Sequence, residues 1–296
     1  MLTFRKIELS DKEWIQECLR KSDFKGCEYS FGNNYIWRNV YQLEICNVDG
    51  FYCVRSGKGE KKMYSFPAGS GDLKGTLELL MSDAKETGRE FFLRGITENQ
   101  ISVLDELFPG RFQYELIRDD SDYIYTVEKL STLSGKKLHG KRNHIARFKD
   151  NPNWIYESIS HENMEDCKDM NRRWCEQYSC KDNPGLKEEI CAVKNALNNF
   201  KELGFVGGLI RRDGEVIAYT IGEPLSSDTF VVHIEKAFHE IQGAYPMINQ
   251  QFVLHECQNY KYVNREEDTG DEGLRKAKMS YYPDILLDKY IASYKG

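Results

Sequence analysis

Apolar residues in the first half of the chain recur with the periods of amphipathic helices and short strands. The helical spacing of apolar residues predicts a helix over 11–19. Strand-like runs over 41–47 and 51–56 flank Asp49 and Gly50, and this pair predicts a hairpin because Asp-Gly suits turns with positive φ. The other expectations for this half are an aromatic, loop-like stretch over 28–40 near Gly32 and Asn33, strands over 62–66, 90–96, 112–117 and 122–127, and helices over 73–88 and 99–108.

The second half of the chain repeats this order of helices, hairpin and strands. Strands over 205–211 and 215–222 flank Asp213 and Gly214, which predicts a second Asp-Gly hairpin. The other expected elements are strands over 154–159, 229–234, 262–265 and 285–290, helices over 163–178, 185–203 and 246–259, and a short helical turn over 273–278.

Both halves therefore follow the order helix, hairpin, strand, helix, strand, which indicates an internal structural duplication. Small and polar residues cluster over 131–136 and mark the expected boundary. We expect an α/β (α+β) protein of two tandem domains with mixed sheets, spanning 1–133 and 134–296.

Composition supports a globular chain with two packed units. The chain has 296 residues, of which 40% are hydrophobic and 12% aromatic, enough to form a buried core. Its longest apolar runs hold about six residues, whereas a membrane-spanning helix needs about 20. The first 14 residues are rich in charge and hold no apolar signal-peptide core, so we expect a cytoplasmic protein without an integral membrane span.

Cysteine and histidine usage indicates neither a disulfide framework nor a metal centre. The nine cysteines are odd in number and form no Cys-x-x-Cys pair, and the six histidines show no His-x-x-x-His spacing. No cysteine has a recognised histidine partner, and no Gly-x-Ser-x-Gly motif occurs. We therefore expect no structural metal and no covalent acyl-enzyme.

One segment is strongly basic, although the whole chain has a net charge of −6. Residues 136–149 hold six cations, two histidines and no carboxylate. Clustered lysines and arginines favour phosphate-bearing ligands, so Lys141, Arg142 and Arg147 are candidate contacts to tRNA backbone, a nucleotide or a lipid headgroup. The alternative is a solvated, charged helix that links the two domains.

Several motifs in order resemble a known family over nearly the whole chain. A hairpin followed by a strand, a loop of small residues and a helix resembles the GNAT (N-acyltransferase) core. Four segments resemble the soluble C-terminal domain of phosphatidylglycerol lysyltransferases: 34–38, 140–148, 264–270 and 273–278. Members are similar in fold to Fem-type aminoacyltransferases. The resemblance implies tandem GNAT-like domains and transfer of an aminoacyl group from charged tRNA to an amine or hydroxyl.

The sequence departs from that family in one respect. The lysyltransferases attach this domain to a membrane-embedded flippase, and no hydrophobic span occurs in this sequence. The resemblance therefore leaves the acceptor open, with peripheral contact to a lipid headgroup as one option.

The loop that binds the CoA pyrophosphate in GNAT enzymes needs several glycines at a helix start. The corresponding stretch, 239–246, offers Gln242 and a single glycine, Gly243, before Pro246. A plain turn with a proline opening the next helix explains it equally well. The weak match favours an aminoacyl ester over acyl-CoA as the co-substrate, and we expect no tightly bound cofactor.

Polar residues near the end of the 229–234 strand are the candidates for proton transfer. Glu235 can take a proton from an attacking amine, although a glutamate at a strand end is often merely exposed. His233 beside it is expected to be a packed core residue. Asn249, on the opening turn of the next helix, either faces the same cleft or caps that helix.

A charged turn near the C-terminus supplies the other candidates. Asp268 can bind the ammonium group of an aminoacyl substituent, while Arg265, Arg275 and Lys278 can bind carboxylate or phosphate. The alternative is an acidic turn without a ligand.

These inferences favour a cytosolic acyl or aminoacyl transferase whose second domain carries the active cleft. Transfer would be direct, with backbone N–H groups at a strand bulge polarising the donor carbonyl. The alternative is a non-catalytic module that binds a nucleotide, tRNA or a phospholipid headgroup.

Overall fold

The computed structural model describes residues 2–179 and 184–296 and divides into two compact units. Unit 1 comprises the chain up to Tyr123 together with Glu267–Arg275 and Leu286–Gly296, and unit 2 comprises Ile124–Glu266 and Lys276–Ile285. This division differs from the expected boundary at 133/134. The reason is that two C-terminal segments return to unit 1.

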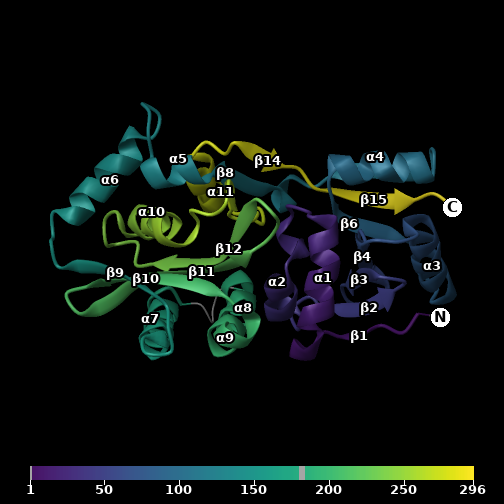
Figure 1. Ribbon diagram of the computed structural model, residues 1–296, viewed down its shortest axis with the longest axis horizontal. Helices are drawn as coiled ribbons and strands as arrows, with labels where there is room; N and C mark the ends of the chain where they lie inside the picture. Colours follow the sequence, from purple (N-terminus) through teal and green to yellow (C-terminus); the bar gives the residue numbers. More distant parts are fainter. Residues whose placement is uncertain (1, 180–183) are drawn as a thin grey trace. The chain divides into compact units, whose positions relative to one another are not determined.

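Unit 1 is built on a mixed sheet of eight strands (Figure 1). The strands in spatial order are β1 (Arg5–Lys6), β2 (Glu44–Val48), β3 (Phe51–Ser56), β4 (Met63–Ser65), β6 (Phe92–Ile96), β15 (Tyr290–Tyr294) and β7 (Phe112–Leu116), with β5 (Ala68–Gly69) paired to β3. Strands β4 and β6 are parallel, and a helix connects them. The apolar face of that helix packs on the sheet through Leu77, Leu80 and Ala84.

The helices of unit 1 are α1 (Lys12–Ser22), α2 (Phe31–Trp37), α3 (Leu73–Glu86) and α4 (Glu98–Leu107), with one-turn 3-10 helices at Leu9–Asp11, Cys27–Tyr29, Gly59–Lys61 and Arg118–Asp120. The expected loop near Gly32 and Asn33 is wrong, since both residues lie in α2. Ser30 caps this helix by accepting a hydrogen bond from Asn33 N, and Phe31 and Ile36 are almost fully buried. Packing of these apolar side chains outweighs the weak helix propensity of glycine and asparagine.

Unit 2 is built on a seven-stranded sheet with the same plan. The strands in spatial order are β14 (Ile285–Leu287), β8 (Asp122–Thr126), β13 (Tyr262–Asn264), β12 (Thr229–Ala237), β11 (Glu215–Pro224), β10 (Val206–Arg212) and β9 (Trp154–Ser158). Strands β12 and β13 are parallel and are connected by a helix, as β4 and β6 are in unit 1. This repeated order confirms the internal structural duplication.

The remaining helices are α5 (Val127–Thr132), α6 (His139–Lys149), α7 (Met164–Gln177), α8 (Pro184–Asn198), α9 (Phe200–Leu203), α10 (Ala244–Glu256) and α11 (Glu272–Met279). Helix α10 covers one face of the unit 2 sheet, and α7, α8 and α9 cover the other (Figure 1). The expected helix over 185–203 is divided at Asn199.

Both Asp-Gly hairpins form as expected. Asp49 and Gly50 have φ of 47° and 88°, and Asp213 and Gly214 have φ of 51° and 88°. The expected single strand over 285–290 is wrong, because β14 joins one sheet and β15 the other. Each sheet thus receives one inner strand from a distant part of the sequence: β15 lies between β6 and β7, and β8 lies between β13 and β14.

Two irregularities of β12 mark the part of the sheet where polar side chains gather. The parallel pairing of β12 with β13 runs only from Thr229–Val231 to Tyr262–Asn264, after which β12 continues to Ala237. Against β11, Ile234 pairs with Ile221 and Val232 with Gly222, so His233 is the extra residue of a β-bulge. Beyond Val231, side chains of β12 contact the chain that follows β13: His233 binds Glu266, and Glu235 binds Arg265.

Candidate active site

Glu235 lies at the centre of the polar side chains in unit 2. It extends from β12 beyond the last parallel pair with β13, and its side chain is 12% exposed. Arg265 Nη2 donates to Glu235 Oε1 at 2.8 Å, and Asn249 Nδ2 donates to Glu235 Oε2 at 3.0 Å. Both carboxylate oxygens are therefore held in place, which is not the case for a merely exposed glutamate at a strand end.

Arg265 is the first residue after β13, and its guanidinium is surrounded by aromatic rings. Its central carbon lies 5.0 Å from the ring centroid of Tyr281 and 5.8 Å from that of Tyr125. Burial acts to lower the pKa of Arg265, but Glu235, Tyr125 and Tyr281 together outweigh it, and the pKa is raised. Its second terminal nitrogen, Nη1, is buried and has no hydrogen-bond partner.

Asn249 extends from α10 toward the sheet and is 2% exposed. It does not cap the helix, since Gly243 occupies the N-cap position. Its amide nitrogen binds Glu235, while its oxygen, Oδ1, is buried without a partner. A buried polar atom left unpaired costs about 1–3 kcal/mol, so this arrangement is unfavourable unless something else satisfies it.

Thr220 completes this group and was not anticipated from the sequence. It stands opposite Glu235 in the β11–β12 ladder, so the two side chains leave the same face of the sheet. The residue is fully buried, and its hydroxyl has no hydrogen-bond partner. The sequence signal is slight: Thr220 is the one residue with an aliphatic hydroxyl within the run Val216–Gly222.

Lys141 approaches the same group from α6. Its ammonium lies 4.0 Å from the ring centroid of Tyr281, the ring that also faces Arg265. Burial lowers the pKa of Lys141 to about 8, and the charge of Arg265 acts in the same direction while Glu235 opposes it. With this pKa, Lys141 is still mostly charged at pH 7, but it loses its proton more readily than an ordinary lysine.

His233 is buried as expected, but it is charged rather than apolar in character. Its Nδ1 lies 2.7 Å from Glu266 Oε1, and its Nε2 lies 2.9 Å from Glu223 Oε1. Burial acts to lower the pKa of His233, but the two carboxylates raise it to about 9. The imidazolium therefore connects β11, β12 and the turn after β13 where backbone pairing has stopped.

Lys278 supports that turn from α11. Its ammonium donates to the carbonyl oxygens of Arg265 at 2.7 Å and Glu266 at 3.2 Å. The side chain is buried, and these contacts fix the backbone that presents Arg265 and Glu266.

Most of the basic segment forms α6, and its cations have different environments. Arg142 donates to the carbonyl oxygens of Leu133 and Gly135, the latter at 2.7 Å, and so holds the end of α5 and the following link. Arg147 is exposed on α6. Arg142 thus stabilises the local backbone, whereas Arg147 is exposed to solvent.

The stretch over 239–246 has a packing reason for its glycine. Gly243 has φ of 84°, and a Cβ at this position would lie 2.2 Å from His144 O on α6. Gln242 is exposed. Close approach of α6 to α10 therefore requires glycine here, whether or not a phosphate binds.

Asp268 and Arg275 belong to unit 1 and bind each other. Arg275 donates to Asp268 Oδ1 at 2.7 Å, and Tyr123 and Gly270 N also donate to this fully buried carboxylate. Burial acts to raise the pKa of Asp268, but Arg275 and Tyr123 lower it to about 2. Arg275 also binds Asp119. The acidic turn is thus an internally paired cluster.

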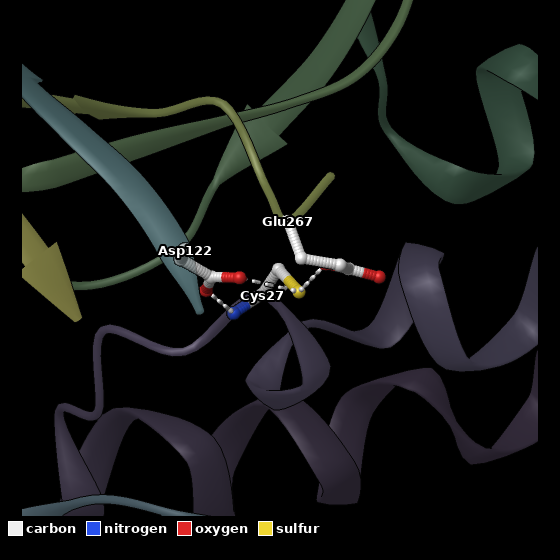
Figure 2. Close-up of side chains that lie close together, drawn as sticks. All are labelled: Cys27, Asp122 and Glu267. Carbon is white, nitrogen blue, oxygen red and sulfur yellow. Dashed lines mark hydrogen bonds between the residues drawn. The ribbon is translucent and has the colours of Figure 1, made fainter. Parts of the chain in front are cut away.

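A second buried cluster of unit 1 surrounds Cys27 (Figure 2). Its thiol sulfur lies 3.5 Å from Asp122 Oδ1 and 3.3 Å from Glu267 Oε2, and ligand atoms of these three residues lie within 4.8 Å of one another. Lys289 Nζ lies 2.7 Å from both Asp122 Oδ1 and Glu28 Oε2. The residue types suit a metal ion, but Lys289 already supplies a positive charge among them. Burial raises the pKa of the Cys27 thiol well above its usual value.

Comparison with solved structures identifies the architecture. A conserved protein of unknown function from Bacteroides thetaiotaomicron is 40% identical, with all of both chains covered and a TM-score of 0.95. The C-terminal domain of a proposed lysylphosphatidylglycerol synthetase from Agrobacterium fabrum is 12% identical, with 97% of this chain and 92% of that chain covered and a TM-score of 0.69. FemX is 9% identical, with 100% and 96% covered and a TM-score of 0.57.

The fold is that of two tandem GNAT-like domains with mixed sheets, related to the Fem-type fold. The chain belongs to the family of the phosphatidylglycerol lysyltransferase C-terminal domain, whose model matches residues 19–293. An uncharacterized protein of Mycoplasmoides gallisepticum is 20% identical over 195 residues, which are 63% of this chain and 60% of that protein. The match thus spans less than two thirds of that relative's length. Among the described residues, no helix is long and apolar enough to cross a membrane.

Proposed function

We propose that this chain transfers an aminoacyl or acyl group to an amine or hydroxyl acceptor, and that the group around Glu235 in unit 2 is the active site. The observation that carries this proposal is the Glu235 carboxylate itself. Arg265 and Asn249 hold it on both oxygens at the point where β12 and β13 separate. Family membership and the name of the Agrobacterium relative support aminoacyl transfer as the reaction class.

The reaction is a direct displacement at the donor's ester carbonyl. The acceptor nitrogen or oxygen attacks the carbonyl carbon and forms a new bond to it. The bond from that carbon to the ester oxygen breaks, and the electron pair leaves on this oxygen. Glu235 takes the proton from the acceptor, which is then passed to the leaving oxygen. A fixed carboxylate favours this step because it is already oriented.

We infer that the donor is an aminoacyl-tRNA bound in the cytoplasm, with exposed cations of α6 contacting its phosphates. Arg147 is exposed there, and Lys141 is close to the Glu235 group. In this proposal Arg142, Arg275 and Lys278 position backbone and carboxylate groups of the protein, because their donors already bind such groups. Packing on α6 accounts for Gly243, and the stretch over 239–246 offers only this glycine and Gln242, so acyl-CoA is kept as the alternative donor.

The test is transfer by the purified chain. Incubation with charged tRNAs or acyl-CoAs and a panel of amine and hydroxyl acceptors should give a new amide or ester in mass spectra. Glu235→Gln should lower kcat by about 10²–10⁴-fold, the usual contribution of a positioned proton acceptor. Glu189→Gln is the matched control, since Glu189 is a partly buried glutamate of unit 2 that pairs with Lys236.

Two results would contradict the proposal. One is the absence of any product across both donor classes, with tRNA or nucleotide binding retained, which would support a binding module. The other is equal turnover by Glu235→Gln and Glu189→Gln.

A further inference from the structure

Unpaired buried polar atoms gather around Glu235. Among the described residues, the buried side-chain nitrogen and oxygen atoms without a hydrogen-bond partner belong to Tyr52, Thr76, Arg118, Thr220, Asn249 and Arg265. The last three all adjoin Glu235: two bind its carboxylate, and Thr220 faces it across the ladder. Native proteins pair nearly all such groups, so a cluster of exceptions at one carboxylate needs an explanation.

The three atoms differ in what they can bind. Arg265 Nη1 is a charged donor, Asn249 Oδ1 is an acceptor, and the Thr220 hydroxyl can do either. The assignment of the Asn249 amide follows from its bond to Glu235, which requires the nitrogen on that side. A ligand that satisfies all three must present both an acceptor and a donor.

A fully ionised phosphate or carboxylate, which has acceptors alone, does not meet this requirement. Its oxygens would suit Arg265, but they would face the lone pairs of Asn249 Oδ1. The charge of Arg265 is also already opposed by Glu235 at 2.8 Å. The Arg265–Glu235 pair therefore suits a carbonyl group, which gains negative charge during the reaction, better than an anion that is fully charged before it.

We infer that these atoms bind the two reacting groups of the transfer, an inference that rests on the proposed function. Arg265 Nη1 and the Thr220 hydroxyl donate to the donor's carbonyl oxygen, which receives the electron pair of the carbonyl bond when the acceptor attacks. Asn249 Oδ1 accepts from one N–H of an acceptor amine, while Glu235 takes the proton of the other N–H. When the bond to the ester oxygen breaks, the pair returns to the carbonyl and the proton taken by Glu235 goes to the leaving oxygen.

This assignment gives the carbonyl a side-chain partner in addition to any backbone N–H at the β12 bulge. It also explains why a hydroxyl at Thr220 and a second terminal nitrogen at Arg265 are present, since neither group has a hydrogen-bond partner within the protein. The effect of removing the Thr220 hydroxyl on catalysis can be measured separately from its effect on stability, because this hydroxyl makes no hydrogen bond within the protein.

The experiment compares two threonines that share this unpaired state. Thr220→Val keeps the side-chain volume and removes the hydroxyl, and Thr76→Val does the same on α3 of unit 1, where Thr76 is also buried and unpaired. We expect both variants to unfold in urea at the midpoint of the unchanged protein or above it. Thr220→Val should lower kcat by about 10²-fold with KM little changed, as for removal of one oxyanion donor, and Thr76→Val should leave kcat unchanged.

Arg265→Lys provides an independent measurement, since a lysine keeps the charge but lacks the second nitrogen of the fork. We expect kcat to fall by about 10²–10³-fold while far-ultraviolet circular dichroism stays unchanged. If the unaltered chain transfers acyl groups and folded Thr220→Val does so within about twofold of its rate, this inference is overturned while the proposed function stands. An equal loss in Thr76→Val would also overturn it. If the unaltered chain transfers nothing, the proposed function itself fails.

Discussion

The two units share a strand order but differ in how they treat buried charge. In unit 1, Asp83 on α3 accepts hydrogen bonds from Tyr64 at 2.6 Å and Arg55 at 3.0 Å. In unit 2, α10 takes the corresponding place between the two parallel strands, and its Asn249 leaves one polar atom unpaired. Helices in equivalent positions thus carry a buried carboxylate that is hydrogen-bonded in one unit and a buried amide with an unpaired oxygen in the other.

The strands differ in the same sense. Strand β4 of unit 1 has three residues, whereas β12 of unit 2 has nine and continues beyond its parallel partner. The longer strand carries His233 and Glu235 into the region where pairing has ended. A duplicated fold thus supplies the scaffold twice, but among the described residues three unpaired buried polar atoms adjoin a single carboxylate, Glu235, in unit 2.

The Lys289 cluster tests whether the unit 1 network is structural. Lys289→Met should lower the free energy of unfolding by about 3–5 kcal/mol, because it leaves the buried carboxylate of Asp122 without its cation. Urea unfolding measures this loss, and Lys295→Met at the exposed C-terminal end is the control. A loss below about 1 kcal/mol would show that this cluster is not a stabilising pair and would weaken the comparison.

The His233 bridge predicts a pH dependence of stability from unit 2. The folded state raises the pKa of His233 from an ordinary 6.5 to about 9, so the folded state binds the proton more tightly. Its contribution is fully present below about pH 6.5 and is lost as pH rises through about 9. The shift corresponds to a contribution of order 3 kcal/mol. His233→Gln should remove this slope from urea unfolding measured at several pH values.

Exposed His239 offers a matched control for that measurement, since His239→Gln should leave the slope intact. A slope that survives in His233→Gln would mean that the imidazolium bridge does not contribute as described.

The smallest expected effect concerns α6. Arg147→Ala should weaken tRNA binding modestly and reduce the slope of log affinity against log salt by about 1, because it removes one exposed phosphate contact. Arg142→Ala should leave the slope unchanged and lower stability by about 1 kcal/mol, since its donors bind Leu133 and Gly135. Filter binding at several salt concentrations measures both. Equal slopes for Arg147→Ala and the unaltered chain would remove α6 from the proposed tRNA contact.

Local patterns made much of the fold predictable. The hairpins at Asp49-Gly50 and Asp213-Gly214 depend on neighbouring residues, and the duplication follows from the repeated order of elements. Helix α2 and the division of 285–290 into β14 and β15 were missed. They depend on burial of Phe31 and on pairing with strands distant in sequence, which periodicity does not contain.

The candidate site was predictable only in part. The sequence singled out Glu235 and Asn249, and the structure places their side chains in contact, although their roles remain a prediction. Thr220 was missed because its importance comes from its register opposite Glu235. The charge of His233 likewise depends on Glu223 and Glu266, which approach only in the folded chain.

The most direct test of the central claim is a crystal structure with a non-hydrolysable aminoacyl-adenosine amide, which carries the carbonyl and amino groups of the proposed donor. The account predicts that its carbonyl oxygen lies within about 3.2 Å of Arg265 Nη1 and the Thr220 hydroxyl, beside Glu235 in unit 2. A bound analogue whose carbonyl lies elsewhere, with these atoms still unpaired, would contradict it.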